Sequence, residues 1–81
     1  MEYPKLFAPE YGKVYENRGG GTYRCIDRTA WRANTARAWM QNTRSGWAFT
    51  AVGCRMYQDG TIEWDYSTGG EFLPIKTEAS L

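Results

Sequence analysis

Two acidic residues, Glu63 and Asp65, form the best candidate pair for chemistry in this 81-residue chain. Two positions apart on a strand, they would project from one face roughly 7 Å apart, a spacing that suits a retaining glycosidase or a divalent cation. A chain this short has a thin core and offers no deep cleft, and its sequence shows no third ligand. Salt bridges or solvent exposure therefore explain the two carboxylates better than catalysis does.

A triple glycine, Gly19-Gly20-Gly21, lies between Arg18 and Arg24. Successive backbone N–H groups in such a loop can cradle a phosphate. The phosphate-loop pattern G-x-x-x-x-G-K-[ST] is absent, however, and no helix is expected to follow the glycines. A hairpin turn is the better interpretation, because glycine adopts the positive φ angles that tight turns need.

Histidine is absent from the sequence, which removes Ser-His and Cys-His catalytic arrangements and histidine metal sites. The hydroxyls of Ser45, Ser67 and Thr68 therefore lack an evident base. Two cysteines cannot form a structural zinc site unless carboxylates or a second subunit contribute. We expect a non-enzymatic protein with no catalytic residue, no metal and no cofactor.

The most informative feature is the interleaving of arginines with aromatic residues across residues 23–57. Such surfaces form protein-interface hot spots, which are enriched in Trp, Tyr and Arg. They also bind nucleotides or single-stranded nucleic acid by stacking and phosphate contacts. The structural alternative is that tryptophans fill a small core and arginine stems cover it. The candidate binding residues are Arg24, Trp31, Arg32, Arg37, Trp39, Arg44, Trp47, Arg55 and Tyr57.

The net charge of +1 conceals an uneven distribution. Residues 18–55 hold seven arginines against Asp27 alone, whereas residues 56–81 carry a net charge of −4. The arginine block is a candidate surface for anions or nucleic acid, because arginine offers a planar donor fork and stacks on rings. Alternatively, the acidic segment folds back and pairs with the arginines across neighbouring strands.

Alternating segments predict strands that position these side chains, over residues 13–17, 22–26, 36–42, 47–58 and 61–67, with a short final strand over Phe72, Leu73 and Ile75. Residues 43–46 and 67–70 read as turns. Residues 28–42 are alanine-rich and also suit a helix. We favour a loop or helical turn through residue 34 and then a strand, with Ala36, Ala38 and Met40 on one face and Arg37, Trp39 and Gln41 on the other.

Asp59-Gly60 predicts a hairpin, whose loop length decides which side chains face the core. A two-residue loop pairs Gln58 with Thr61. A three-residue loop with a glycine bulge pairs Tyr57 with Thr61 and sets Arg55 opposite Glu63. It also groups Val52, Cys54, Met56, Ile62, Trp64 and Tyr66 on one face. We favour the three-residue loop.

The predicted fold is mainly β, a small antiparallel meander of four to six strands with at most one short helix, and an SH3-like barrel is one form it can take. Residues 1–12 are expected to form an extended N-terminal arm, residues 13–76 a single β domain and residues 77–81 a loose tail. A thin core with many rings also makes a dimer a reasonable expectation.

No membrane span or signal peptide is expected. The longest apolar stretch, residues 47–54, is far shorter than the ~20 residues of a spanning helix. A cytoplasmic location follows, in which Cys25 and Cys54 are reduced thiols that behave as small buried hydrophobes. A single disulfide between them is the alternative.

The strings NRGGGTYRC (17–25) and MQNTRSGWAFTAVGCRMYQDGTIEWDYSTGGEF (40–72) resemble short uncharacterised proteins encoded by phages and mobile elements of Firmicutes. The pattern SGW…DG-I-WDYS-GG carries the resemblance, which covers most of residues 17–72. It implies an accessory role in the cytoplasm of a bacterial host. Small phage proteins often antagonise host defence, by blocking an effector protein or sequestering a signalling nucleotide. The resemblance implies no catalytic or binding residues.

Overall fold

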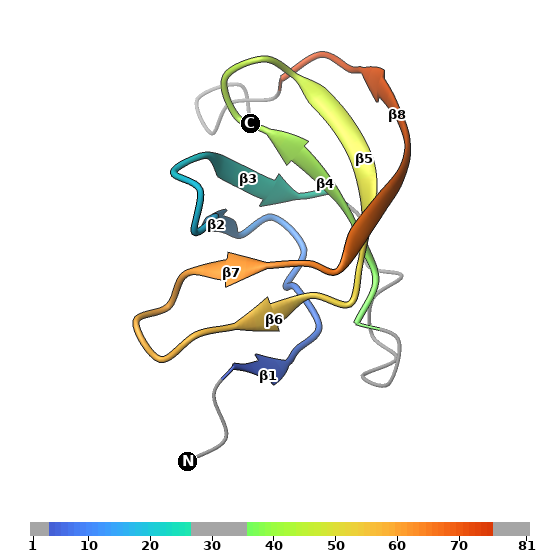
Figure 1. Cartoon of the computed structure of the whole chain (residues 1–81). Coiled ribbons are helices and arrows are strands. Elements are labelled where there is room, and N and C mark those ends of the chain that lie inside the picture. Colours follow the sequence, from blue (N-terminus) through green and yellow to red (C-terminus); the bar gives the residue numbers. More distant parts are fainter. Residues whose placement is uncertain (1–3, 27–35, 76–81) are drawn as a thin grey trace.

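The chain folds as two antiparallel sheets, seen in a computed structural model that describes residues 4–26 and 36–75. One sheet has the strand order β1-β6-β7 and the other the order β2-β3-β4-β5-β8 (Figure 1). The strands are β1 (Lys5–Leu6), β2 (Val14–Glu16), β3 (Thr22–Cys25), β4 (Ala38–Asn42), β5 (Trp47–Val52), β6 (Arg55–Met56), β7 (Ile62–Glu63) and β8 (Tyr66–Phe72). None of the described residues is helical, and the predicted mainly-β antiparallel fold is confirmed.

The prediction of one long strand over residues 47–58 is wrong, because Gly53 divides it into β5 and β6. Gly53 has a φ of +79°, which belongs to the left-handed region that glycine enters at little cost. The next residue, Cys54, donates its backbone N–H to the Ala36 carbonyl at 2.9 Å instead of continuing the ladder. The predicted strand over residues 61–67 is divided in the same region, between Glu63 and Tyr66. Because of these two breaks, β5 and β8 belong to the five-stranded sheet while β6 and β7 belong to the three-stranded sheet. The structure therefore has eight strands instead of the predicted four to six.

The predicted turn over residues 67–70 is also wrong, because these residues lie within β8. Thr68 pairs with Thr50 and Glu71 pairs with Ala48, so two glycines on β8 oppose one residue on β5. Gly69 has a φ of +66°, and the geometry is that of a β-bulge with glycine in the left-handed conformation. The glycine pair thus marks a bulge rather than a chain reversal. Leu73 and Ile75, predicted in a final strand, lie beyond the end of β8.

The strand predicted for residues 36–42 forms over its later part, as β4 (Ala38–Asn42), and Ala36 precedes it with a φ of +45°. Ala36, Ala38 and Met40 are fully buried. Gln41 lies on the opposite face, with Arg37 and Trp39, and is buried as well. Its side-chain Nε2 donates to the carbonyls of Gly46, at 3.1 Å, and Leu73, at 2.9 Å. Residues 73–75 therefore cover this end of the outer sheet face. Residues 28–34, predicted as a loop or helical turn, lie outside the described residues.

The three-residue hairpin loop is confirmed. Arg55 pairs with Glu63 and Met56 pairs with Ile62. The Tyr57 N–H donates to the Thr61 carbonyl at 2.8 Å, which closes the loop over residues 58–60. The three-residue loop was also predicted to group six side chains on one face, and this prediction is only partly confirmed. Cys54 and Ile62 are buried, with Met56 and Trp64 packed against the core, but Tyr66 is 58% exposed.

The hydrophobic core lies between the two sheets. Its fully buried side chains include Met40 of β4 and Ile62 of β7. The rings of Tyr23, Phe49 and Trp64 pack edge to face or tilted, with centroids 5.1–5.7 Å apart. Cys25 and Cys54 are both buried thiols, so the alternative of a disulfide between them is not formed. Burial raises the pKa of the Cys54 thiol to about 12.

A candidate binding hollow on the outer sheet face

The face of the five-stranded sheet that points away from the core carries three of the predicted binding residues. Arg24 pairs with Gln41 across β3 and β4, and Arg37 and Trp39 precede Gln41 at alternate positions. Because alternate residues of a strand share a face, Arg24, Arg37 and Trp39 all lie on this outer face. Arg24 donates to the carbonyl of Gly12 at 2.9 Å.

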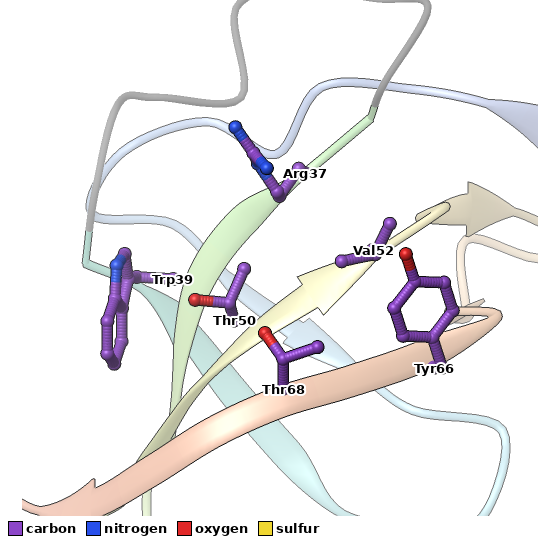
Figure 2. Close-up of a pocket in the computed structure, with 6 residues that line it drawn as sticks. All are labelled: Arg37, Trp39, Thr50, Val52, Tyr66 and Thr68. Atoms are coloured by element: carbon purple, nitrogen blue, oxygen red, sulfur yellow. The ribbon is translucent and has the colours of Figure 1, made fainter.

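A hollow of about 360 Å³ opens on this face over β4, β5 and β8, and we call it the outer hollow (Figure 2). Its described lining residues are Arg37, Trp39, Thr50, Val52, Tyr66 and Thr68. The pairing of the strands explains their proximity: Trp39 pairs with Thr50, Thr50 with Thr68, and Val52 with Tyr66. Trp39 and Tyr66 stand on opposite sides of the two threonines, with Arg37 beyond them (Figure 2).

Arg37 is the one charged residue among the described residues that line the outer hollow. It is exposed, and within the described part of the chain its guanidinium makes no ion pair or hydrogen bond. The threonines add two hydroxyls, and the two rings add apolar surface. This combination can hold a planar or apolar group while donating hydrogen bonds to an anion.

Sequence reasoning missed Tyr66 and Thr68 as binding residues. Tyr66 was predicted on the core face because one strand with a single alternation was predicted across Gly53. Thr68 was predicted in a turn because the strand was predicted to end before Gly69–Gly70. The signal that was present is the alternation of Tyr66 and Thr68 themselves, which continues β8 on one face. If the pair Gly69–Gly70 is interpreted as a bulge instead of the end of a strand, the strand continues and both Tyr66 and Thr68 are predicted on its outer face.

Arg55 and Tyr57 lie elsewhere, on the β6–β7 hairpin, and both are engaged within the fold. The Tyr57 hydroxyl donates to the Glu63 carboxylate, and this hydrogen bond raises the pKa of Tyr57 above its usual value. The Arg18 guanidinium lies 3.9 Å from the centroid of the Tyr57 ring. Arg55 forms an ion pair with Asp65 at 3.4 Å. The predicted pairing of arginines with acidic residues thus occurs on this hairpin.

Arg44 and Trp47 occupy a third location, at the β4–β5 turn. Arg44 is exposed in the turn. Trp47 is 39% exposed and packs edge to face on Phe72, with ring centroids 4.8 Å apart. Trp31 and Arg32 lie outside the described residues. The structure therefore divides the predicted Arg/aromatic surface among separate sites instead of forming one continuous patch.

The candidate catalytic groups are each committed to other contacts. Glu63 accepts from Tyr57 and Asp65 pairs with Arg55. In the glycine turn, the Gly19 N–H donates to the Asn17 side chain at 2.6 Å and the Gly20 N–H to the Asn17 carbonyl at 2.8 Å. These two N–H groups therefore point at the turn's own atoms instead of an external anion.

Within residues 4–26 and 36–75, no group of three histidine, cysteine, aspartate or glutamate side chains is placed to hold a metal ion. The same residues contain no helix long and apolar enough to cross a membrane. A scan of protein-family models and searches of curated proteins and of solved structures find nothing that matches this chain.

Proposed function

We propose that this chain is a non-enzymatic binding protein that engages a protein of the bacterial host, as a phage-type antagonist of anti-phage defence, through the outer hollow. The observation that carries the proposal is the grouping of exposed Arg37, half-buried Trp39 and exposed Tyr66 around one hollow of the sheet face. Arg, Trp and Tyr are the residue types that dominate binding energy at protein interfaces. The accessory role comes from the resemblance to phage proteins, and the contact surface comes from the geometry.

The distribution of charge favours a protein partner over nucleic acid. Phosphate binding needs several cations on one face, but Arg18 and Arg55 are paired with Asp59 and Asp65 on the hairpin. The outer face also carries acidic residues. Glu16 pairs with Thr22 and Glu71 with Ala48, which places both glutamates on the side of Arg24. A face of mixed charge with one exposed ring, Tyr66, and one half-buried ring, Trp39, suits a protein surface.

The proposal is tested by capturing proteins from lysate of a bacterial host with the wild-type chain and with the variants Trp39→Ala and Arg37→Glu. The matched control is Arg44→Glu, which makes the same charge change at an exposed turn outside the outer hollow. We expect host proteins enriched by the wild type and by Arg44→Glu to be lost with both hollow variants. Equal capture by all four proteins would remove the outer hollow as the contact.

A second candidate function, binding of a signalling nucleotide, is favoured by the size of the outer hollow. Its volume of about 360 Å³ falls in the range of roughly 300–1,000 Å³ typical of small-molecule sites. A base could stack on Trp39 or Tyr66 while Arg37 binds a phosphate. Mass spectrometry of nucleotides that co-purify with the wild type, and that Arg37→Glu loses, would favour this function over protein binding.

A further inference from the structure

Strand β8 forms a free edge of the five-stranded sheet (Figure 1). It is seven residues long and every residue in it is exposed. Within the described part of the chain its ladder partner is β5, on one side only. The other side therefore presents backbone N–H and C=O groups that can pair with another strand.

The other sheet edges are shorter and better protected. Strands β1 and β7 have two residues each, and β2 has three. β7 is also covered, because Asn17 bridges to Ile62 and the Arg18 N–H donates to the Ile62 carbonyl. Strand β8 contains neither lysine nor proline, the residues that commonly block edge pairing. Its protective features are the charge of Glu71 and the bulge at Gly69–Gly70, whose glycines carry no side chains.

We propose that β8 pairs antiparallel with β8 of a second copy of this chain, joining two five-stranded sheets into one. The bulge makes this pairing self-complementary. Because Gly69 and Gly70 together oppose one residue of β5, Tyr66, Thr68 and Glu71 occupy consecutive positions on the outer face, symmetric about Thr68. Directly opposed residues of antiparallel strands share a face. A two-fold axis through Thr68 therefore sets Thr68 opposite Thr68 of the second copy, and Tyr66 opposite its Glu71.

The charges of Arg37 and Glu71 favour a second copy of this chain as the partner of the β8 edge. In this register, Val52, Tyr66 and Glu71 of the second copy lie in one row across three strands, and Arg37, which directly precedes β4, extends the row on the far side of Val52. At the usual strand spacing the Cα atoms of Arg37 and of that glutamate are about 14 Å apart, and both side chains are long and exposed. Each copy thus directs a carboxylate toward the cation of the other copy's outer hollow. The two outer hollows then lie side by side across the seam.

The proposal is tested by analytical ultracentrifugation over a concentration series, with the wild type and the single variants Thr68→Lys and Thr68→Glu. We expect a wild-type dimer of twice the 9.3 kDa chain mass. Each variant places like charges on the two-fold axis, which weakens antiparallel pairing, and we expect the dissociation constant to rise about tenfold or more. Mixing the two variants puts opposite charges at the axis and restores the dimer, which also shows that both variants are folded.

Three further variants extend the test. Glu16→Lys changes charge on the opposite edge of the same sheet and leaves the dimer unchanged. Glu71→Arg weakens the dimer, and the double variant Arg37→Glu, Glu71→Arg recovers it because the attraction is restored with reversed signs. A wild-type chain that stays monomeric throughout the series overturns the proposal. So does a dimer that survives both Thr68 variants, or a mixture of them that stays monomeric. Host-protein capture is a separate measurement, so this proposal and the proposed function can fail independently.

Discussion

The β6–β7 hairpin and the outer face of the five-stranded sheet are built from the same residue types but use them differently. On the hairpin, Tyr57 is held by Glu63 and covered by Arg18, and Arg55 is paired with Asp65. On the outer face, Arg37 makes no ion pair with the described residues, and Trp39 and Tyr66 line an open hollow. Interleaved arginines and rings therefore stabilise the fold in one region and remain accessible in the other.

The two regions differ because different residues lie across the neighbouring strand from their arginines. In the hairpin, β6 pairs with β7, so Glu63 lies opposite Arg55 and within hydrogen-bond reach of Tyr57. The outer hollow spans β4, β5 and β8, whose facing residues are threonines and a valine. An arginine beside such neighbours has no carboxylate with which to pair. Availability for binding is therefore set by cross-strand neighbours rather than by residue type.

The largest effect on stability is expected from the core side chain that fixes the hairpin to the sheet. Ile62→Ala removes a fully buried side chain and is expected to lower the free energy of unfolding by about 2–5 kcal/mol. Val52→Ala on the outer face removes a half-buried side chain beside solvent, and is expected to cost less than about 1 kcal/mol. Urea denaturation measures both. Equal losses would mean that the outer face is packed like a core.

The junction between the two regions is expected to be nearly as sensitive. Gly53→Ala forces a side chain into a φ of +79° and brings its Cβ within 3.0 Å of the Asp65 Cβ. Gly60→Ala has a similar φ of +90° but meets no atom within 4 Å. The left-handed conformation costs roughly 1–2 kcal/mol in both variants. Thermal unfolding should therefore show a larger loss for Gly53→Ala, and the excess measures the contact with Asp65.

A smaller loss is expected when the cation of the hairpin is removed. Arg18→Ala deletes the contact with the Tyr57 ring, a 3.0 Å hydrogen bond to Thr61 and the ion pair with Asp59. Because these groups are partly exposed, we expect a loss of about 1 kcal/mol in the free energy of unfolding. Arg44→Ala is the matched control at an exposed turn and should change it by less than about 0.5 kcal/mol. A negligible effect of Arg18→Ala would show that the hairpin arginines are not structural.

The two regions also differ in how far the sequence predicted them. Local signals favoured the correct hairpin: Gln-Asp-Gly-Thr suits a three-residue loop better than a two-residue loop, and the three-residue loop sets Arg55 opposite Glu63. The outer hollow depends on the pairing of β5 with β8 and on Gly53 and Gly69, which form a strand break and a bulge. Because glycine is equally typical of a turn, the alternation of Tyr66 and Thr68 was the available signal for a continuing strand. Arg37 and Trp39 were identified because they belong to the interleaved arginines and aromatic residues of residues 23–57. Tyr66 was missed because the break at Gly53 reverses the face on which it lies, and Thr68 was missed because the bulge at Gly69 lets β8 continue where a turn was predicted.

The titration of Tyr57 provides a pH test of the hairpin. Its hydrogen bond to Glu63 raises its pKa in the folded state above the ordinary value of 10. A raised folded-state pKa means that the folded chain holds the proton more tightly. The stability from this contact is fully present below pH 10 and is lost as the pH rises through the folded-state pKa. Tyr57→Phe should therefore give a shallower loss of stability above that pH.

The alkaline loss does not vanish in Tyr57→Phe, because burial also raises the pKa values of Tyr15 and Cys54. The measurement is the urea midpoint as a function of pH for the wild type and the variant. Identical alkaline slopes would indicate that the Tyr57 hydroxyl is free in solution. The hairpin would then resemble the outer face instead of contrasting with it.

The smallest effect on stability is expected on the outer face, where the effect on binding should be largest. Arg37→Glu removes no contact with the described residues and should change the free energy of unfolding by less than about 0.5 kcal/mol. The same variant should abolish capture of the host partner, because a hot-spot cation becomes an anion at the centre of the contact. A loss of stability as large as that of Arg18→Ala would give Arg37 a structural role and end the contrast between the two regions. Unchanged stability together with unchanged capture would keep the contrast and move the binding surface elsewhere.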